Sequence, residues 1–328
     1  MTNTVKNKYL SAPAKTALLC VFIGALSSCQ AANTPSLEAK VDEKTRNITP
    51  FPSVLDVFSC KPQELAFVAA HRGTHENSKF PENALESLKE LHKRGVPFAE
   101  IDVARINGTT QILYHDGTWD RGSTGSGPIA VTSWEASQKL LLKDTNGNIT
   151  SFRPTAFADV LSWAKGKMYL EVDFKSSTDE AEVIQTIRDA GMIDQVILIS
   201  YNTDQALRLH KLAPSAALSV GIFKPGDIKA LEVRGIPVSV MTAWTGKGPL
   251  THELTEALDT HNIPILAASF YDLDDKLQAS KNYSAYTEFA KLPDLVVSDY
   301  AFNAQQALEI KGENLSDYNN CLLNKQKN

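Results

Sequence analysis

Short β-rich runs and helical patterns alternate from residue 65 to residue 298, and this alternation limits the fold more than any other feature of the chain. It is typical of parallel α/β proteins, in which a helix connects each strand to the next. No linker divides this part of the chain. The candidate strands are residues 65–70, 98–104, 111–115, 168–174, 195–200, 217–222, 236–241, 263–269 and 294–298. This is one strand more than a (β/α)8 barrel requires.

One connection is too short for a parallel crossover. Only residues 106–110 separate the second candidate strand from the third, whereas a crossover takes a dozen or more residues. The connection contains Asn107-Gly108, which favours a two-residue hairpin turn. The sequence therefore predicts a TIM (β/α)8 barrel with a β-hairpin inserted after the second barrel strand. A two-residue turn would also place Glu100 opposite His115, on the face that carries Asp102.

Two basic side chains follow the first candidate strand directly. In barrels of this type, functional side chains lie at the C-terminal ends of the strands. His71 occupies such a position and could transfer protons, while the guanidinium of Arg72 offers paired donors that suit a phosphate. A histidine at a strand end is more often structural when taken alone. The functional interpretation of this pair therefore depends on the residues around it.

Acidic side chains occupy two of the candidate strands. The charged residues on these strands or directly after them are Glu100, Asp102, Glu171, Asp173 and Lys175. Two carboxylates 4 Å apart repel by about 4 kcal/mol at an effective dielectric near 20, so such a cluster takes up protons or a cation. Oxygen ligands without cysteine or clustered histidine favour Mg²⁺ or Ca²⁺ over zinc. Lys175 and Arg72 would then face an anion bridged to one divalent cation.

The first 28 residues resemble a bacterial lipoprotein signal peptide. They carry three lysines and no acid, followed by an apolar run over residues 17–26 that is too short to span a bilayer, for which about 20 residues are needed. Leu26-Ser27-Ser28-Cys29 resembles a lipobox, which predicts lipidation of Cys29; an ordinary signal peptide is the alternative. We divide the chain into a signal peptide (1–28), a tether (29–60) and a barrel domain (61–328), attached by its lipid anchor to the membrane of the cell envelope, on the periplasmic or surface face of the outer membrane.

Cysteine and charge add two further expectations. In an oxidising envelope, Cys60 and Cys321 could form a disulfide, and two buried thiols are an equal alternative. The formal net charge of −5 gives no electrostatic basis for binding nucleic acid.

Trp244, after the seventh candidate strand, is a candidate to bind the alcohol part of a substrate, or choline by a cation–π contact, although packing explains it equally well.

Several short motifs together resemble the glycerophosphodiester phosphodiesterase family, over about residues 65–308. Any one of them is weak, but their order and spacing are specific. They are Ala70-His71-Arg72-Gly73, Pro81-Glu82-Asn83, Glu100-Ile101-Asp102-Val103, His115-Asp116, Asp120-Arg121, Gly125-Ser126-Gly127, Pro154-Thr155, Asp173-Phe174-Lys175 and Ser298-Asp299.

The resemblance implies metal-dependent hydrolysis of a glycerophosphodiester to sn-glycerol 3-phosphate and an alcohol. It implies that His71 and His115 are the general acid and base, that Glu100 and Asp102 bind the metal, and that Arg72 and Lys175 contact the phosphate. The nucleophile is either water or the substrate's own neighbouring hydroxyl group.

The motifs depart from the family's usual pattern at the third metal ligand. Asp173 stands where the family usually has glutamate, and Glu171 lies two residues earlier; we favour Asp173. Two other functions remain as alternatives. One is cleavage of intact phospholipid or sphingolipid headgroups at the same site, and the other is a non-catalytic surface-binding lipoprotein.

Overall fold

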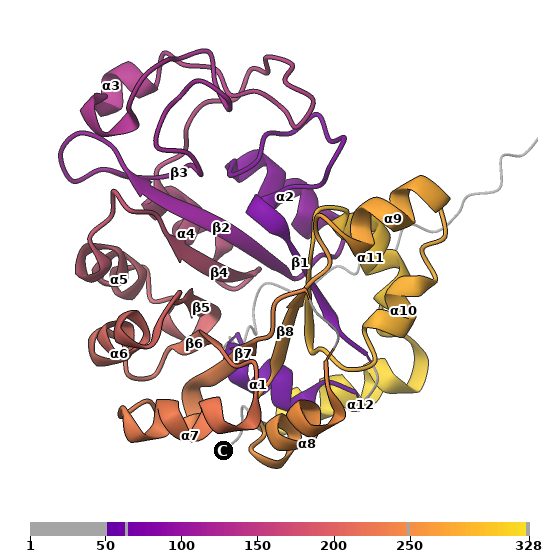
Figure 1. Ribbon diagram of the computed structural model, residues 1–328. Helices are drawn as coiled ribbons and strands as arrows, with labels where there is room; N and C mark the ends of the chain where they lie inside the picture. Colours follow the sequence, from indigo (N-terminus) through magenta and orange to yellow (C-terminus); the bar gives the residue numbers. More distant parts are fainter. Residues whose placement is uncertain (1–50, 63–64, 248–249, 326–328) are drawn as a thin grey trace, which may run out of the picture. The chain divides into compact units, whose positions relative to one another are not determined.

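A closed ring of eight parallel strands forms the centre of the protein (Figure 1). The structure, a computed structural model, describes residues 51–325 except 63–64 and 248–249. The ring runs β1-β9-β8-β7-β6-β5-β4-β2, and pairing between β1 and β2 closes it. Its strands are β1 (Phe67–Ala70), β2 (Phe98–Arg105), β4 (Tyr169–Phe174), β5 (Val196–Ile199), β6 (Ala217–Gly221), β7 (Met241–Trp244), β8 (Ile265–Ala268) and β9 (Leu295–Ser298). The predicted TIM barrel is confirmed.

Helices lie between the strands and cover the outside of the ring (Figure 1). Side-chain oxygens cap several of them: Asp179 accepts from the backbone at the start of α5, and Asn202 does so for α6. The helices are α1 (Val54–Cys60), α2 (Leu85–Lys93), α3 (Trp134–Ser137), α4 (Phe157–Ala164), α5 (Glu180–Asp189), α6 (Thr203–Leu212), α7 (Pro225–Val233), α8 (His252–Thr260), α9 (Leu273–Ser280), α10 (Ala285–Phe289), α11 (Ala301–Leu308) and α12 (Gly312–Lys325).

The strand β3 (Gln111–Leu113) pairs antiparallel with β2, beyond the ring. The predicted register of this pair is wrong by one residue. Val103 pairs with Leu113, and the backbone N–H of Ile106 donates to the carbonyl of Thr110. Three residues therefore form the turn instead of Asn107-Gly108 alone, and Glu100 does not lie opposite His115.

The seventh predicted strand is also displaced. Residues Val238–Val240 form a 3₁₀ turn after Pro237, and β7 begins at Met241 instead of at residue 236. Trp244 is therefore the last residue of this strand. The β-branched run over residues 236–241 predicts a strand from composition, but the proline removes a backbone donor and the strand forms after it.

The N-terminal end of the barrel is closed by α1. Val54, Val57 and Phe58 are buried in the cluster that fills the inside of the ring, and the ring of Phe58 lies 5.7 Å from that of Phe98. Residues 51–60 therefore belong to the folded domain and not to the predicted tether. The inside of the barrel at this end is filled by apolar side chains, and the predicted site residues lie toward the C-terminal ends of the strands.

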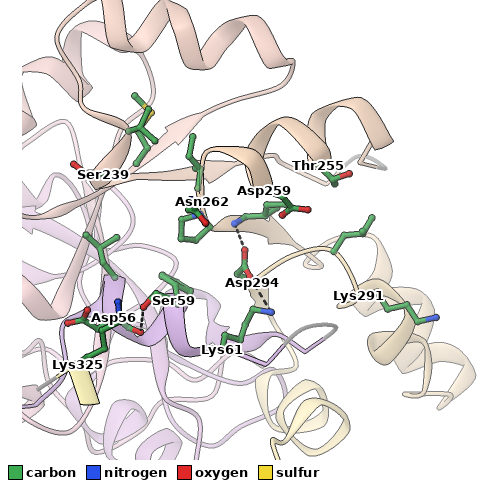
Figure 2. A pocket seen from close by; sticks show the side chains of 18 residues that line it. Asp56, Ser59, Lys61, Ser239, Thr255, Asp259, Asn262, Lys291, Asp294 and Lys325 are labelled. Carbon is green, nitrogen blue, oxygen red and sulfur yellow. Dashed lines mark hydrogen bonds and ion pairs between the residues drawn. The ribbon is translucent and has the colours of Figure 1, made fainter. Parts of the chain in front are cut away.

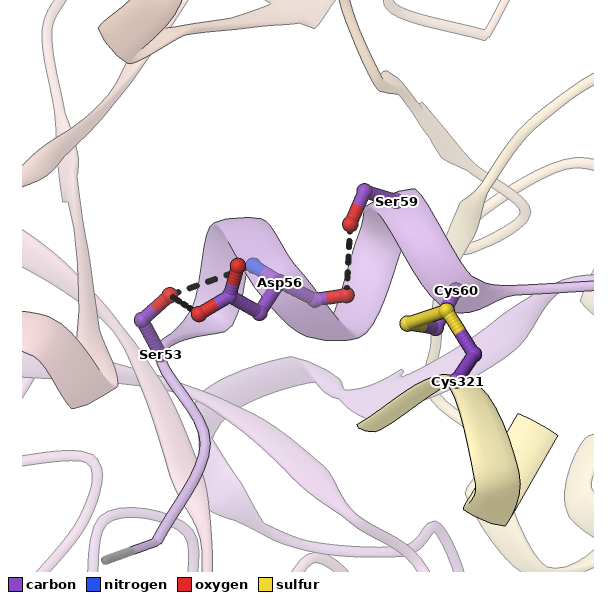
Figure 3. Close-up of a disulfide and its surroundings, with 5 residues drawn as sticks. All are labelled: Ser53, Asp56, Ser59, Cys60 and Cys321. Carbon is purple, nitrogen blue, oxygen red and sulfur yellow. Dashed lines mark hydrogen bonds between the residues drawn. A yellow bond between two sulfur atoms is a disulfide. The ribbon is translucent and has the colours of Figure 1, made fainter. Parts of the chain in front are cut away.

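A disulfide holds α1 and α12 together at this closed end (Figure 3). Cys60 and Cys321 are bonded across a separation of 261 residues. In the loop-entropy model, closing a loop of this length stabilises the folded state by about 5 kcal/mol.

A cavity of about 790 Å³ also lies at this end, lined by residues of α1, α8 and the segments before β7, β8 and β9 (Figure 2). Lys61 crosses it to form an ion pair with Asp294 at 3.2 Å, and the backbone N–H of Ile265 donates to Asp294 at 2.7 Å. These contacts join the segments around the barrel floor. The cavity holds none of the predicted site residues.

Among the described residues, none of the helices has the length and apolar character needed to cross a bilayer. The predicted signal peptide, the lipidation site Cys29 and most of the predicted tether lie outside the described residues.

Candidate active site

A cavity of about 390 Å³ opens at the C-terminal ends of the strands, and its wall has two chemically different halves. The segments from β1 to β4 contribute ionisable side chains, and those from β5 to β9 contribute mainly apolar ones. The ionisable group is His71, Glu100, Asp102, His115, Glu171, Asp173 and Lys175. The other half is Ile199, Ser200, Tyr201, Ser219, Gly221, Phe223, Trp244, Phe270 and Val297. The barrel thus brings almost all of the predicted site residues to one place.

Three buried carboxylates form the centre of the ionisable half. One oxygen from each of Glu100, Asp102 and Asp173 lies within 4.8 Å of the others. The cause is the parallel register of β2 and β4, which sets Asp102 beside Asp173 and Glu100 beside Glu171. One oxygen of Asp173 is buried without a hydrogen-bond partner. An all-oxygen group with an unpartnered acceptor fits a hard divalent cation.

Glu171 is not part of this group of three carboxylates, although it also lines the cavity. Burial raises the pKa of its carboxyl group to about 8. The cause is burial alone, which disfavours the charged form of the carboxyl group. Of the two candidates on β4, Asp173 is the one that the fold places with Glu100 and Asp102.

Asn83 holds the carboxylate of Asp102 in place, a role that the sequence analysis did not assign to it. Its side-chain amide donates to Asp102 at 2.6 Å, and its carbonyl oxygen accepts from the backbone N–H of Asp102 at 2.9 Å. Its backbone has a φ of 54°, which asparagine tolerates better than most residues. Pro81-Glu82-Asn83 therefore precedes α2 as part of the site, and the helix begins only at Leu85.

Lys175 bridges two of the carboxylates. Its ammonium group lies 2.6 Å from Asp102 and 2.7 Å from Asp173. Burial acts to raise the pKa of Asp102, but Lys175, His115 and Asn83 outweigh it, so this pKa lies below its ordinary value. Burial and the charge of Asp102 raise the pKa of Glu100 well above its ordinary range. A cation bound between these carboxylates would favour the ionised form of Glu100.

Each of the two predicted catalytic histidines has a carboxylate partner. His71 contacts Asp299, the residue after β9, with 2.7 Å between Nδ1 and the carboxylate oxygen. The imidazole also stacks on Phe270, with ring centroids 4.1 Å apart. Asp299 belongs to the motif Ser298-Asp299, and its pairing with His71 spans 228 residues of sequence. Such a long-range contact cannot be found from local pattern alone.

His115 is held in the same way by its sequence neighbour. Its Nδ1 lies 2.6 Å from a carboxylate oxygen of Asp116, and Arg121 donates to the other oxygen at 2.7 Å. Burial acts to raise the pKa of Asp116, but Arg121 and His115 lower it to about 2. Asp116 is therefore a carboxylate over the whole working range of pH. In both pairs Nδ1 is occupied, which leaves Nε2 as the free nitrogen of the ring.

Arg72 is not among the residues that line the cavity. Its side chain donates to Glu82 at 3.2 Å and to the hydroxyl of Tyr271 at 3.3 Å, while its backbone N–H donates to Glu100 at 2.7 Å. The Nε–H of Arg72 is buried without a partner. In the structure the guanidinium pairs with Glu82, and the predicted contact of Arg72 with a phosphate stays a prediction.

Two aromatic side chains complete the wall. Trp244 lines the cavity as predicted for a substrate-binding residue, with its ring 6.4 Å from that of Phe270. Tyr201, which the sequence analysis did not single out, donates its hydroxyl hydrogen to Asp173 at 2.8 Å. A tyrosine two residues after a strand carries no pattern that would have indicated this contact.

The site residues from His71 to Lys175 all lie in a segment with known relatives. Residues 71–222 match the Glycerophosphoryl diester phosphodiesterase family. The resemblance predicted from the motifs is confirmed. Glycerophosphodiester phosphodiesterase 1 of Rattus norvegicus is 32% identical over 91 residues, which are 28% of this chain and 27% of the relative. A glycerophosphodiester phosphodiesterase of Caldanaerobacter subterraneus is 26% identical over 162 residues, 47% of this chain and 65% of the relative. The chain thus spans about a quarter of the length of the mammalian relative it matches.

Solved structures agree on the fold. A glycerophosphoryl diester phosphodiesterase from Parabacteroides distasonis superposes with a TM-score of 0.71 at 24% identity, over 79% of this chain and 92% of that one. A phosphodiesterase of Oleispira antarctica in complex with the product sn-glycerol-3-phosphate has a TM-score of 0.57 at 20% identity, over 77% of this chain and 99% of that one. The barrel described above is therefore the fold of these proteins.

Proposed function

We propose that the protein hydrolyses glycerophosphodiesters to sn-glycerol 3-phosphate and an alcohol, with the help of one divalent cation. One observation carries the proposal. A single cavity contains a group of three buried carboxylates together with two histidines that are each held by an aspartate. The family match and the product named for the Oleispira relative support the choice of substrate.

Each part of the site then has a role. Glu100, Asp102 and Asp173 would hold Mg²⁺ or Ca²⁺, which would neutralise charge on the phosphoryl oxygens when bound. Because the Nδ1 atoms of His71 and His115 are paired with aspartates, Nε2 is the ring nitrogen left for proton transfer. One imidazole takes a proton from the attacking hydroxyl, and the other gives a proton to the departing alkoxide.

The test is an assay of the purified domain with glycerophosphocholine and Mg²⁺ or Ca²⁺, in which sn-glycerol 3-phosphate and choline are both measured. We expect equal amounts of the two products, loss of activity with a chelator, and recovery when the cation is restored. His115→Ala should lower kcat by about 10²–10⁴-fold with an unchanged thermal transition. A lack of products with every cation would refute the activity, and activity that resists the chelator would refute the role of the metal.

We also propose that the protein is an envelope lipoprotein anchored through Cys29. The charge and hydropathy pattern of residues 1–28 supports this, and so does a disulfide, a bond that persists in oxidising compartments. Cys29→Ala should move the protein from the membrane fraction to the soluble fraction, whereas Cys20→Ala, in the same apolar run, should not. Membrane association that survives Cys29→Ala would show that the anchor is elsewhere.

A further inference from the structure

The cavity wall has an ionisable half and an apolar half, which indicates a substrate that likewise has a charged part and an apolar part. Going around the ring, every acidic or basic lining residue comes from the segments β1 to β4. Among the described lining residues from β5 to β9, none carries a charge, and the large ones are Ile199, Tyr201, Phe223, Trp244 and Phe270. A deacylated glycerophosphodiester is polar throughout and would gain little from contact with this second half.

The apolar half continues to the outer rim of the site. Phe223 follows β6 with 63% of its surface exposed, although it is a large apolar residue. Its ring lies against the backbone of Gly221, where a Cβ atom would come within 2.9 Å of it. Tyr201 and Tyr271 are exposed at the same end of the barrel, at 70% and 57%. Exposed aromatic side chains that border a cavity are a common mark of a binding surface.

The aromatic surface is not suited to a quaternary ammonium group. The ammonium of Lys247 lies 4.7 Å from the ring centroid of Phe270 and 4.6 Å from that of Tyr271, so a cation of the protein itself already contacts these rings. A second cation there would be repelled by Lys247. An uncharged hydrocarbon chain does not meet this difficulty, because it needs only apolar surface.

We infer that the cavity takes glycerophosphodiesters that retain one acyl chain, that is, lysophospholipids. The phosphodiester lies at the carboxylates and histidines, and the acyl chain follows Trp244 and Phe270 toward Phe223 at the rim. In the net reaction, water adds its oxygen to phosphorus, the bond from phosphorus to the headgroup oxygen breaks, and that oxygen receives a proton. The products are an acylglycerol phosphate and the free headgroup alcohol. The inference rests on the proposed phosphodiesterase activity.

Substrates of one headgroup and increasing chain length test it. Glycerophosphocholine and its hexanoyl, octanoyl and decanoyl monoesters are compared at concentrations below micelle formation, with choline release as the readout. Each methylene that becomes fully buried multiplies transition-state binding by about fourfold. We expect kcat/KM to rise at least tenfold from the hexanoyl to the decanoyl ester. A flat or falling series in an enzyme that hydrolyses glycerophosphocholine would overturn the inference and leave the proposed function intact, whereas no hydrolysis of any substrate would refute the function itself.

Two variants test where the acyl chain binds. Phe223→Ser removes apolar surface at the rim and should flatten the rise in kcat/KM with chain length. Val233→Ser is the matched control, because Val233 is also an exposed apolar residue, at 75%, but ends α7 outside the cavity lining. This control should keep the full rise. An equal rise in both variants would place the chain elsewhere and overturn the assignment.

Discussion

At the scale of residues, the catalytic centre depends on pairs of side chains. His71 is held by Asp299 from the far end of the barrel sequence, and Asp299 is itself held, since its backbone N–H donates to the buried carboxylate of Asp274 at 2.7 Å. A histidine fixed at Nδ1 has one tautomer and one orientation available for proton transfer. The carboxylate partners should therefore matter to the rate although they do not line the cavity.

Asp299→Asn tests this dependence. The amide keeps the size of the side chain but cannot stabilise a protonated imidazole, so we expect kcat to fall by about 10–100-fold or more, with a change in the pH profile. The measurement is kcat against pH, with circular dichroism as a check of the fold. Asp272→Asn, at an exposed carboxylate in the same rim, is the control and should keep the wild-type profile. An unchanged rate and profile in Asp299→Asn would rule out a positioning role.

His75 gives a second prediction at this scale, on stability. It stacks on Phe302 at 4.2 Å and accepts a hydrogen bond from the backbone N–H of Phe302. Burial, assisted by the charge of Arg94, lowers the pKa of His75 to about 4. The unfolded chain therefore binds this proton more tightly than the folded one. The resulting stability is fully present above about pH 6.5 and is lost as the pH falls through 4, by at most about 3 kcal/mol.

Urea unfolding between pH 4 and pH 7 measures this effect. His75→Phe keeps a ring against Phe302 but removes the titration, so its stability should depend less on pH over this interval. His252→Phe, at a side chain that is 91% exposed, should keep the wild-type dependence. Parallel pH dependence in the wild type and in His75→Phe would contradict the prediction.

At the scale of elements, local sequence patterns predict the strands and the residues on them better than they predict the contacts between distant segments. The strand runs and the alternation of acids on β2 and β4 were sufficient to predict the carboxylate group, because parallel register brings alternate residues of neighbouring strands together. The predicted turn after β2 is one residue too short, because Asn-Gly favours a two-residue turn but does not exclude a longer one. Asn83 and Tyr201 could not be assigned roles, because their partners depend on how loops fold over the barrel.

The disulfide between α1 and α12 yields a prediction for elements. Among the described residues, none of the side chains of α12 is fully buried, so its attachment depends on Tyr318, Leu322 and the bond to Cys60. The double variant Cys60→Ser/Cys321→Ser should lose about 2–5 kcal/mol in urea unfolding. Reductant should destabilise the wild type by a similar amount and leave the double variant unchanged. Equal stability with and without the bond would show that packing alone holds α12.

At the scale of the whole molecule, the carboxylate group makes stability depend on cations. Three buried carboxylates within 4.8 Å of one another destabilise the fold through repulsion and desolvation, and a bound cation removes part of that cost. A ligand at 100 times its Kd stabilises the folded state by about 2.7 kcal/mol, which for a domain of this size raises Tm by about 5–10 °C. We expect such a rise with Mg²⁺ or Ca²⁺ and its reversal by a chelator.

Asp173→Asn and Asp259→Asn separate specific binding from a general salt effect. The first removes a charge of the proposed metal site and should abolish the rise in Tm, and the second removes a carboxylate at the opposite end of the barrel and should keep it. If Tm rises equally in both variants, the cation acts elsewhere and the assignment of these ligands is wrong.

The bond between residues 60 and 321 also sets an order of events for the molecule as it is made. Every strand of the barrel lies between its two cysteines in chain order, so the bond can close only after the last strand has been synthesised. Its closure therefore follows the synthesis of every strand of the ring. A chain that met oxidant late, or not at all, would fold with its two ends unsecured and would present them first to proteases.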